Sequence, residues 1–181
     1  ATFAVGESVI IPDRYREEYH HFVGSELDSL SQVPYSMNEK SALLTVVPQV
    51  AELVAGGKLK LSDTVGDLLE TEVSDASLTV GQLLDGYKDA ANAGYLKTLL
   101  EKYRSYISID GVTKQMLGKM GMRSTELIPA VSDGGIPQVT TTGYDYQKYL
   151  FTLGNGGKYA GDQVISASAA ELVIGVLQEA K

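Results

Sequence analysis

Residues 36–57 have the sequence SMNEKSALLTVVPQVAELVAGG, and this stretch decides the expected fold. Ser36 and Glu39 stand at the spacing of a capping box, in which two side chains bond free backbone N–H groups of a first helical turn. Apolar residues follow at helical intervals, at Leu43, Val47, Val50 and Val54. The glycine pair that ends the stretch supplies a stop. Pro48 predicts a kink, because proline removes one backbone hydrogen bond. We therefore expect a long, mostly buried helix that starts at Ser36.

The same helical period returns along the rest of the chain and predicts a mostly α fold. Thr79 and Gln82 form a second capping box before an apolar run. Apolar stripes predict further helices over about residues 90–106, 111–120, 142–154 and 168–177. Gly121 is expected to end one of them in the left-handed conformation. β-like residues gather only in 2–12, which we expect to form a short strand or hairpin.

Length, charge and cysteine content exclude several classes of protein. The 181 residues suit one domain, with an irregular or β segment over 1–34 and a helical body over 35–181. The net charge of −8 repels phosphate backbones, so nucleic acid is not an expected partner. No apolar run approaches the ~20 residues that a membrane span needs. The absence of cysteine excludes disulfides and thiol chemistry.

Five short segments, taken in order, resemble one known family. They are GKLKLSDTV at 57–65, LTVGQLL at 78–84, VTKQMLGKMGMRST at 112–125, TTT at 140–142, and the run from GGK at 156–158 to VIS at 164–166. With Lys40 and Ser41 ahead of the long helix, this order is similar to that of the serine β-lactamase and penicillin-binding-protein (transpeptidase) superfamily. The resemblance covers about residues 35–181. It implies the helical subdomain of that α+β fold, with a short N-terminal β segment and without the family's C-terminal strands.

The resemblance also implies a catalytic pattern, which this chain follows only in part. The family's nucleophilic serine lies three residues before a lysine, and that position here holds Met37, three residues before Lys40. Ser36 is one residue further back and shares a helix face with Lys40, since residues four apart are neighbours on a helix. We favour the interpretation of Ser36 as a helix N-cap, whose hydroxyl accepts a backbone N–H.

The other two motifs of the family are incomplete as well. Its S-D-N motif falls on Lys88, Asp89 and Ala90, so that Asp89 alone matches, and an N-cap role explains this aspartate. The K-T-G strand would follow the last helix, where the sequence ends. Between residues 126 and 138, Glu126 is the only acid near the place of the family's deacylating loop, and an exposed loop acid is the favoured interpretation.

The hypothesis that follows is a catalytically impaired β-lactamase-like protein, a pseudoenzyme or binding module associated with the cell envelope. Its expected partner is a peptidoglycan-type peptide, a glycan or a protein. The first alternative is an active β-lactamase or D-alanyl-D-alanine carboxypeptidase that uses Ser36, Lys40 and Asp89. The second is an unrelated helical interaction domain, which would place Met37 away from any cleft.

No cofactor or metal is expected. His20 and His21 are adjacent, so they cannot easily face one metal ion, and we interpret them as a surface pair. Tyrosines cluster near residues 95–106 and 144–149, where aromatic rings could bind a partner. A helical core explains most of these rings equally well.

Overall fold

The computed structural model describes residues 2–4, 10–12, 32–69, 73, 75–104, 108–131 and 135–179. Helices dominate this part of the chain, with three small sheets, so the expected mostly α fold is confirmed. The assignment to 1–34 and 35–181 as parts of one domain stays a prediction. None of the helices in the described ranges has both the length and the apolar character that crossing a membrane requires.

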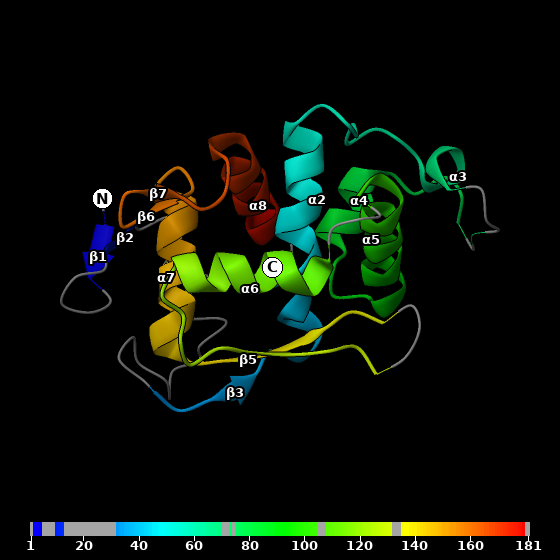
Figure 1. The fold of residues 1–181 in the computed structure, drawn as a ribbon. Helices are drawn as coiled ribbons and strands as arrows, with labels where there is room; N and C mark the ends of the chain where they lie inside the picture. The colour runs from blue at the N-terminus through cyan, green and yellow to red at the C-terminus, as the bar shows by residue number, and fades with distance from the viewer. Residues whose placement is uncertain are drawn as a thin grey trace.

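The helical body is built around α2 (Val46–Ala55), which lies at its centre in Figure 1. It packs against α8 (Ala167–Glu179) on one side and α5 (Ala90–Tyr103) on the other. The short helix α4 (Val80–Asp85) packs on α5 and α8, and α7 (Gly143–Gly154) packs on α8. In Figure 1, α6 (Ile109–Lys119) crosses in front of α2, and α3 (Val65–Leu68) stands at the far edge. Leucine, valine, methionine and tyrosine side chains from these helices form one buried core.

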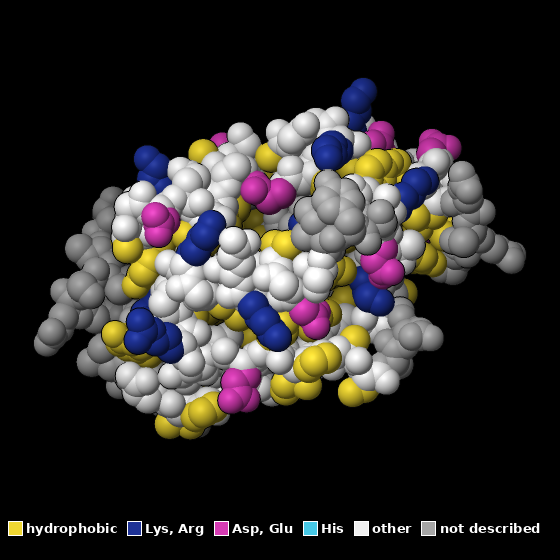
Figure 2. Space-filling model, viewed as in Figure 1, with side chains coloured by type: hydrophobic (Ala, Val, Ile, Leu, Met, Phe, Trp, Pro, Cys, Tyr) yellow, Lys and Arg dark blue, Asp and Glu magenta, His cyan; other side chains and the backbone are white. Residues whose placement is uncertain are grey.

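The strands lie at the margins of the helical body. β1 (Thr2–Ala4) pairs antiparallel with β2 (Ile10–Pro12), which fits the hairpin predicted over 2–12. The second sheet has the order β3 (Tyr35–Ser36), β5 (Gln138–Thr141) and β4 (Glu126–Ile128), with both pairings antiparallel. β6 (Lys158–Tyr159) and β7 (Asp162–Gln163) form a small hairpin after α7. Figure 2 shows acidic and basic side chains interspersed on one face, with hydrophobic ones gathered along its lower edge, where β4 and β5 lie.

The start of the first helix differs from the expectation. Residues Asn38–Leu44 form a 3₁₀ helix, η2, and the α-helix begins only at Val46. The N-cap of η2 is Met37, which makes no side-chain capping bond, so the predicted Ser36–Glu39 capping box is wrong. Pro48 is the third residue of α2 and does not interrupt a longer helix. In a first turn, the N–H that proline lacks has no intrahelical partner anyway.

Long-range contacts explain this altered start. The Met37 N–H donates to the Val139 carbonyl at 2.9 Å, and the buried Ser41 hydroxyl accepts the Val139 N–H at 2.9 Å. Both bonds tie the chain on either side of Asn38 to the same residue of β5. The tighter winding of η2 brings Met37 and Ser41 to that one point on the strand.

Other predicted helix ends are confirmed. The Thr79 hydroxyl accepts the Gln82 N–H at 3.1 Å, and the Gln82 side chain accepts the Thr79 N–H at 2.9 Å, which completes the capping box of α4. Gly121 follows α6 with φ +64°, the left-handed region that favours glycine. The Thr142 hydroxyl caps α7 by accepting the Asp145 N–H at 3.0 Å. These ends position the segments that surround the candidate site.

Candidate functional site

A cavity of about 470 Å³ opens where three separate parts of the chain meet; we call it the first cavity. Asn38 and Glu39 come from the start of η2, and Lys88 comes from the turn before α5. Ala90 and Ala93 line it from the first turns of α5, and the rest of the wall comes from β4, β5 and the chain between them, at residues 128–131, 135, 136 and 138. These three parts are the ones that the resemblance assigns to the nucleophile, to S-D-N and to the acidic loop.

The predicted nucleophile positions do not line this cavity. Met37 is 3% exposed and belongs to the hydrophobic core, because its N–H is fixed on β5 and its side chain points inward. Ser36 is exposed in β3, where its hydroxyl donates to Asn38 Oδ1 at 3.0 Å and accepts the Asn38 N–H at 3.3 Å. A serine hydroxyl has a single hydrogen to donate, so in this arrangement it is directed at Asn38 and not at Lys40.

Lys40 and Asp89 stand outside the cavity wall as well. Lys40 is half-buried, and its N–H donates to the Met37 carbonyl at 2.9 Å within the 3₁₀ turn. Asp89 is the N-cap of α5, as predicted, and its carboxylate accepts the N–H groups of Ala91 at 2.9 Å and Asn92 at 3.3 Å. The three motif-bearing segments thus meet at the cavity, but the three predicted catalytic side chains do not line it.

Asn38 is the residue that sequence reasoning missed. Its φ is +50°, a left-handed conformation that costs most residues free energy and that asparagine tolerates better than others. It stands between two residues fixed on β5 and lines the cavity. Strained residues of this kind gather at functional sites. An asparagine directly after the failed nucleophile position was the one available signal.

The groups on the cavity wall suit binding better than acyl transfer. Glu39 supplies a carboxylate, Lys88 an ammonium group, and Asn38 and Gln138 supply amides. Among the described lining residues, the only hydroxyl belongs to Tyr87, which is 3% exposed. The remaining wall is apolar, and it includes the exposed side chain of Ile128. Such a site can pair with polar groups of a ligand and cover its apolar part.

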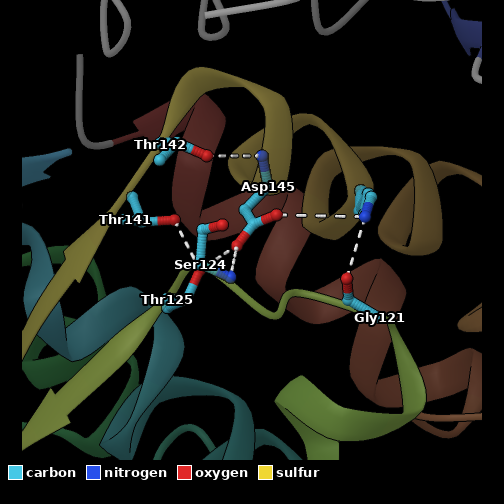
Figure 3. Close-up of polar contacts among 7 residues, drawn as sticks. Gly121, Ser124, Thr125, Thr141, Thr142 and Asp145 are labelled. Atoms are coloured by element: carbon cyan, nitrogen blue, oxygen red, sulfur yellow. Dashed lines mark hydrogen bonds and ion pairs between the residues drawn. The ribbon is translucent and has the colours of Figure 1, made fainter. Parts of the chain in front are cut away.

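A second polar cluster, which we call the Asp145 network, lies buried at the start of α7 (Figure 3). One carboxylate oxygen of Asp145 accepts the Ser124 N–H at 2.9 Å and the Thr125 hydroxyl at 2.7 Å. The other lies 3.8 Å from Lys148 Nζ, which donates to the Gly121 carbonyl at 2.8 Å. The three hydrogen bonds run between α7 and the 121–125 loop, and the ion pair lies within α7. The network therefore fixes that loop and positions β4, and Asp145 does not line the first cavity.

The remaining candidates from the sequence are the histidine pair, the tyrosine clusters and Glu126. His20 and His21 lie outside the described residues, and within the described ranges no group of acidic or histidine side chains could hold a metal ion. Tyr146 and Tyr149 are core residues, 1% and 0% exposed, so they are not a binding surface. Glu126 is exposed, as predicted, but it lies in the strand β4 and not in a loop.

Comparison with known proteins adds no relative: no protein-family model, no curated protein and no solved structure matches this chain. The resemblance to serine β-lactamases rests on the sequence motifs, and the functional assignment is a proposal.

Proposed function

We propose that this protein is a non-catalytic, β-lactamase-like binding module of the cell envelope whose first cavity holds a small peptide-like ligand. One observation carries the proposal. The three segments that resemble the family's site meet at this cavity, yet Ser36, Lys40 and Asp89 lie outside its wall. The parts of a catalytic constellation act as a unit, so a cavity that these side chains do not line keeps little of the rate advantage but remains a pocket.

The chemistry of the wall indicates the class of ligand. Lys88 and Glu39 bring opposite charges to the cavity wall, so a molecule with a carboxylate and an N–H donor can pair with both. The amides of Asn38 and Gln138 can each donate and accept. The apolar wall then covers small aliphatic side chains. A volume of about 470 Å³ is within the usual range for small-molecule sites.

Binding of N-acetyl-D-alanyl-D-alanine tests the proposal, because this dipeptide has a carboxylate, N–H groups and methyl side chains. The measurement is a ¹H–¹⁵N NMR titration, with the backbone signals of Glu39 and Lys88 expected to shift. Lys88→Gln should weaken binding about tenfold or more, since a charge-assisted hydrogen bond is lost. Lys58→Gln is the matched control: it removes the same charge from the exposed turn after α2 and should leave binding unchanged. Equal effects of the two variants would contradict the proposal.

A hydrolase remains the second candidate function, favoured by the exposed Ser36 hydroxyl and its contact with the cavity residue Asn38. Intact-mass spectrometry after incubation with a fluorescent penicillin separates the two. We expect no covalent adduct on the folded protein. An adduct that disappears in Ser36→Ala would establish the hydrolase and overturn the non-catalytic assignment.

The third candidate, an unrelated helical interaction domain, is favoured by the burial of Met37 in the core. It predicts that neither the penicillin nor the dipeptide perturbs the signals of the first cavity. The titration above therefore also decides between this candidate and the binding module.

A further inference from the structure

A second cavity, of about 520 Å³, adjoins the first and shares Pro129 and Ala130 with it. Its other lining residues come from the C-terminal half of α5 and its C-cap, from residues 108–110 at the start of α6, and from Pro137. A volume of this size is typical of sites that hold small molecules. The wall carries four charged side chains, and the partners of these side chains decide what the cavity can bind.

Both cations on this wall are engaged within the protein. Lys97 Nζ lies 3.3 Å from the Glu101 carboxylate, one helical turn further along α5. The guanidinium group of Arg104 donates a hydrogen bond to Gln49 Oε1, and Gln49 is a residue of α2 that is 3% exposed. Gln49 is held in turn, since its amide donates to Thr113 Oγ1 at 2.9 Å. Both positive charges of the wall therefore have partners within the fold.

Asp110 differs from the other charged residues of the wall. Within the described ranges, its carboxylate forms no hydrogen bond and no ion pair. It does not cap α6 either, because Ser108 is the N-cap and its hydroxyl accepts the Gly111 N–H at 3.1 Å. The dipole of α6 offsets part of the negative charge but leaves the carboxylate oxygens available as acceptors. Since Asp110 is half-buried, water solvates its carboxylate only in part, and a cation that pairs with it is stabilised.

The rest of the wall is mainly apolar. Ile109, the neighbour of Asp110 in the sequence, is half-buried, and Pro137 is buried. Pro129 and Ala130 are exposed and belong to the same wall. The side chains of these four residues contain no polar group that a ligand would have to satisfy. The cavity thus offers one carboxylate together with an apolar surface that a hydrocarbon group can cover.

The charge of the whole protein acts in the same direction. A net charge of −8 raises the concentration of cations near the surface and lowers that of anions. An anionic ligand of this cavity would have to compete with the existing partners of Lys97 and Arg104, whereas a cationic ligand meets the unpaired carboxylate of Asp110. Local contacts and overall charge therefore both favour a cation.

We propose that the second cavity binds a small organic cation, a protonated amine with an apolar body, whose ammonium group pairs with Asp110. The hydrocarbon part of the ligand packs against Ile109, Pro129 and Pro137. The charged residue that holds this ligand does not line the first cavity, so the site goes beyond the proposed function and does not depend on it.

Benzylamine tests this proposal, because it is protonated at neutral pH and carries one compact apolar group. Benzyl alcohol has nearly the same shape without the charge, and methylamine has the charge without the ring. In ¹H–¹⁵N NMR titrations, benzylamine should shift the backbone signals of Asp110 and Lys97. It should also bind about tenfold or more tightly than either of the other two compounds. Equal binding of benzyl alcohol and benzylamine, or no shift at Asp110, would overturn the proposal.

Asp110→Asn removes the charge and keeps the shape of the side chain, and the Ser108 cap of α6 stays in place. This variant should bind benzylamine about tenfold or more weakly. Asp67→Asn is the matched control, since Asp67 is an exposed aspartate in the first turn of α3 that lines neither cavity. It changes the net charge equally and should leave binding unchanged. Equal weakening in the two variants would mean that benzylamine responds only to the overall charge, and the site would be overturned.

Glu39→Gln distinguishes the second cavity from the first, whose wall also carries a carboxylate. We expect this variant to bind benzylamine as tightly as the unmodified protein does. If Glu39→Gln lost the binding while Asp110→Asn kept it, the amine would occupy the first cavity and the proposal would be overturned. The titration with N-acetyl-D-alanyl-D-alanine concerns the first cavity alone, so its result and the benzylamine result can be read separately.

Discussion

The Asp145 network and the wall of the first cavity use the same kinds of side chain under opposite conditions. Each contains a carboxylate and an ammonium group, Asp145 with Lys148 and Glu39 with Lys88. Asp145 is 2% exposed and accepts two hydrogen bonds besides its ion pair. Glu39 is exposed and faces a cavity. A buried charge is tolerated only when partners replace water, whereas a charge on a cavity wall stays available to a ligand.

The comparison separates stability from binding. Changes within the Asp145 network should lower the free energy of unfolding and leave cavity chemistry intact. Changes at the exposed Glu39 on the cavity wall should alter cavity chemistry and leave the free energy of unfolding nearly unchanged, because exposed substitutions usually cost little stability. The predictions below test this division, beginning with the largest expected effect.

Asp145→Asn should cause the largest loss of stability. It leaves Lys148, 9% exposed, without its negative partner, and breaking one side of a buried pair costs about 3–5 kcal/mol. Glu39→Asn would change length as well as charge, so the matched control is Glu39→Gln, which converts an exposed acid into its amide and should change stability by less than ~0.5 kcal/mol. Urea denaturation measures both. Equal losses of stability in Asp145→Asn and Glu39→Gln would show that the buried network and the cavity wall do not differ as described.

Tyr149→Phe should give the next largest effect. The buried Tyr149 hydroxyl donates to the Leu43 carbonyl at 2.5 Å, and its removal leaves that carbonyl unpaired at a cost of about 1–3 kcal/mol. Burial, with a smaller contribution from Tyr87, raises the pKa of Tyr149 far above its ordinary value. A raised folded pKa gives stability that is complete below the unfolded pKa of about 10 and is lost as pH rises above it.

The pH dependence of unfolding checks this assignment. Urea denaturation at neutral pH and above pH ~10 should show an alkaline loss of stability that is smaller in Tyr149→Phe than in the unmodified protein. If Tyr149→Phe kept the full alkaline loss of stability, a group other than Tyr149 would be its cause. Tyr159 is one such source, because burial foremost, followed by Tyr144 and Asp145, also raises its pKa.

Local signals in the sequence were sufficient to predict most helix ends. Thr79 with Gln82, Asp89 and Gly121 each act within three residues of their partners, and the structure confirms all three. The helix predicted over 142–154 is also present, with Thr142 as its N-cap. The mostly α class follows from the same short-range periodicity. These interactions need no knowledge of the rest of the chain.

The start of the first helix could not be predicted in this way. The Val139 backbone that fixes Met37 and Ser41 lies about a hundred residues further along the sequence. The wall of the cavity could not be predicted from local sequence either, because Glu39, Lys88 and Ile128 are far apart in the chain and meet only in the folded protein. Segments that line the cavity were named from the sequence, but the position of Asn38 on its wall was not.

Replacing Asn38 tests the cavity side of the comparison and should have a small effect on stability. Glycine adopts φ +50° without strain, so Asn38→Gly should stay within about 1 kcal/mol of the unmodified protein. Asn38→Ala should lose about 1–2 kcal/mol, because alanine lacks the amide whose local hydrogen bond helps asparagine adopt the left-handed region. Both variants lack the amide and should bind N-acetyl-D-alanyl-D-alanine about tenfold more weakly. Thermal unfolding and the NMR titration measure the two effects. Unchanged binding by Asn38→Gly would remove Asn38 from the site.

The smallest effect is expected from the exposed counterpart of a bond in the Asp145 network. The Ser77 hydroxyl donates to Asp75 at 2.6 Å, as the Thr125 hydroxyl donates to Asp145 at 2.7 Å, but the first bond is exposed and the second part-buried. The side-chain bond from Ser77, and then its N–H, lower the pKa of Asp75. A lowered folded pKa gives stability above the unfolded pKa that is lost as pH falls, so any contribution disappears only in acid.

Ser77→Ala should therefore raise the pKa of Asp75 toward its ordinary value without a measurable change in stability at neutral pH, whereas Thr125→Val should cost about 1–3 kcal/mol. The carboxyl resonance of Asp75, followed by NMR from neutral to acid pH, measures the first change, and urea denaturation measures the second. Two hydrogen bonds of nearly equal length would then differ in their contribution to the free energy of unfolding. Water can replace the Ser77 hydroxyl at Asp75, but it cannot reach Asp145. If the two variants lost equal stability, burial would not be what distinguishes the two regions, and the division between a stabilising network and a binding wall would fail.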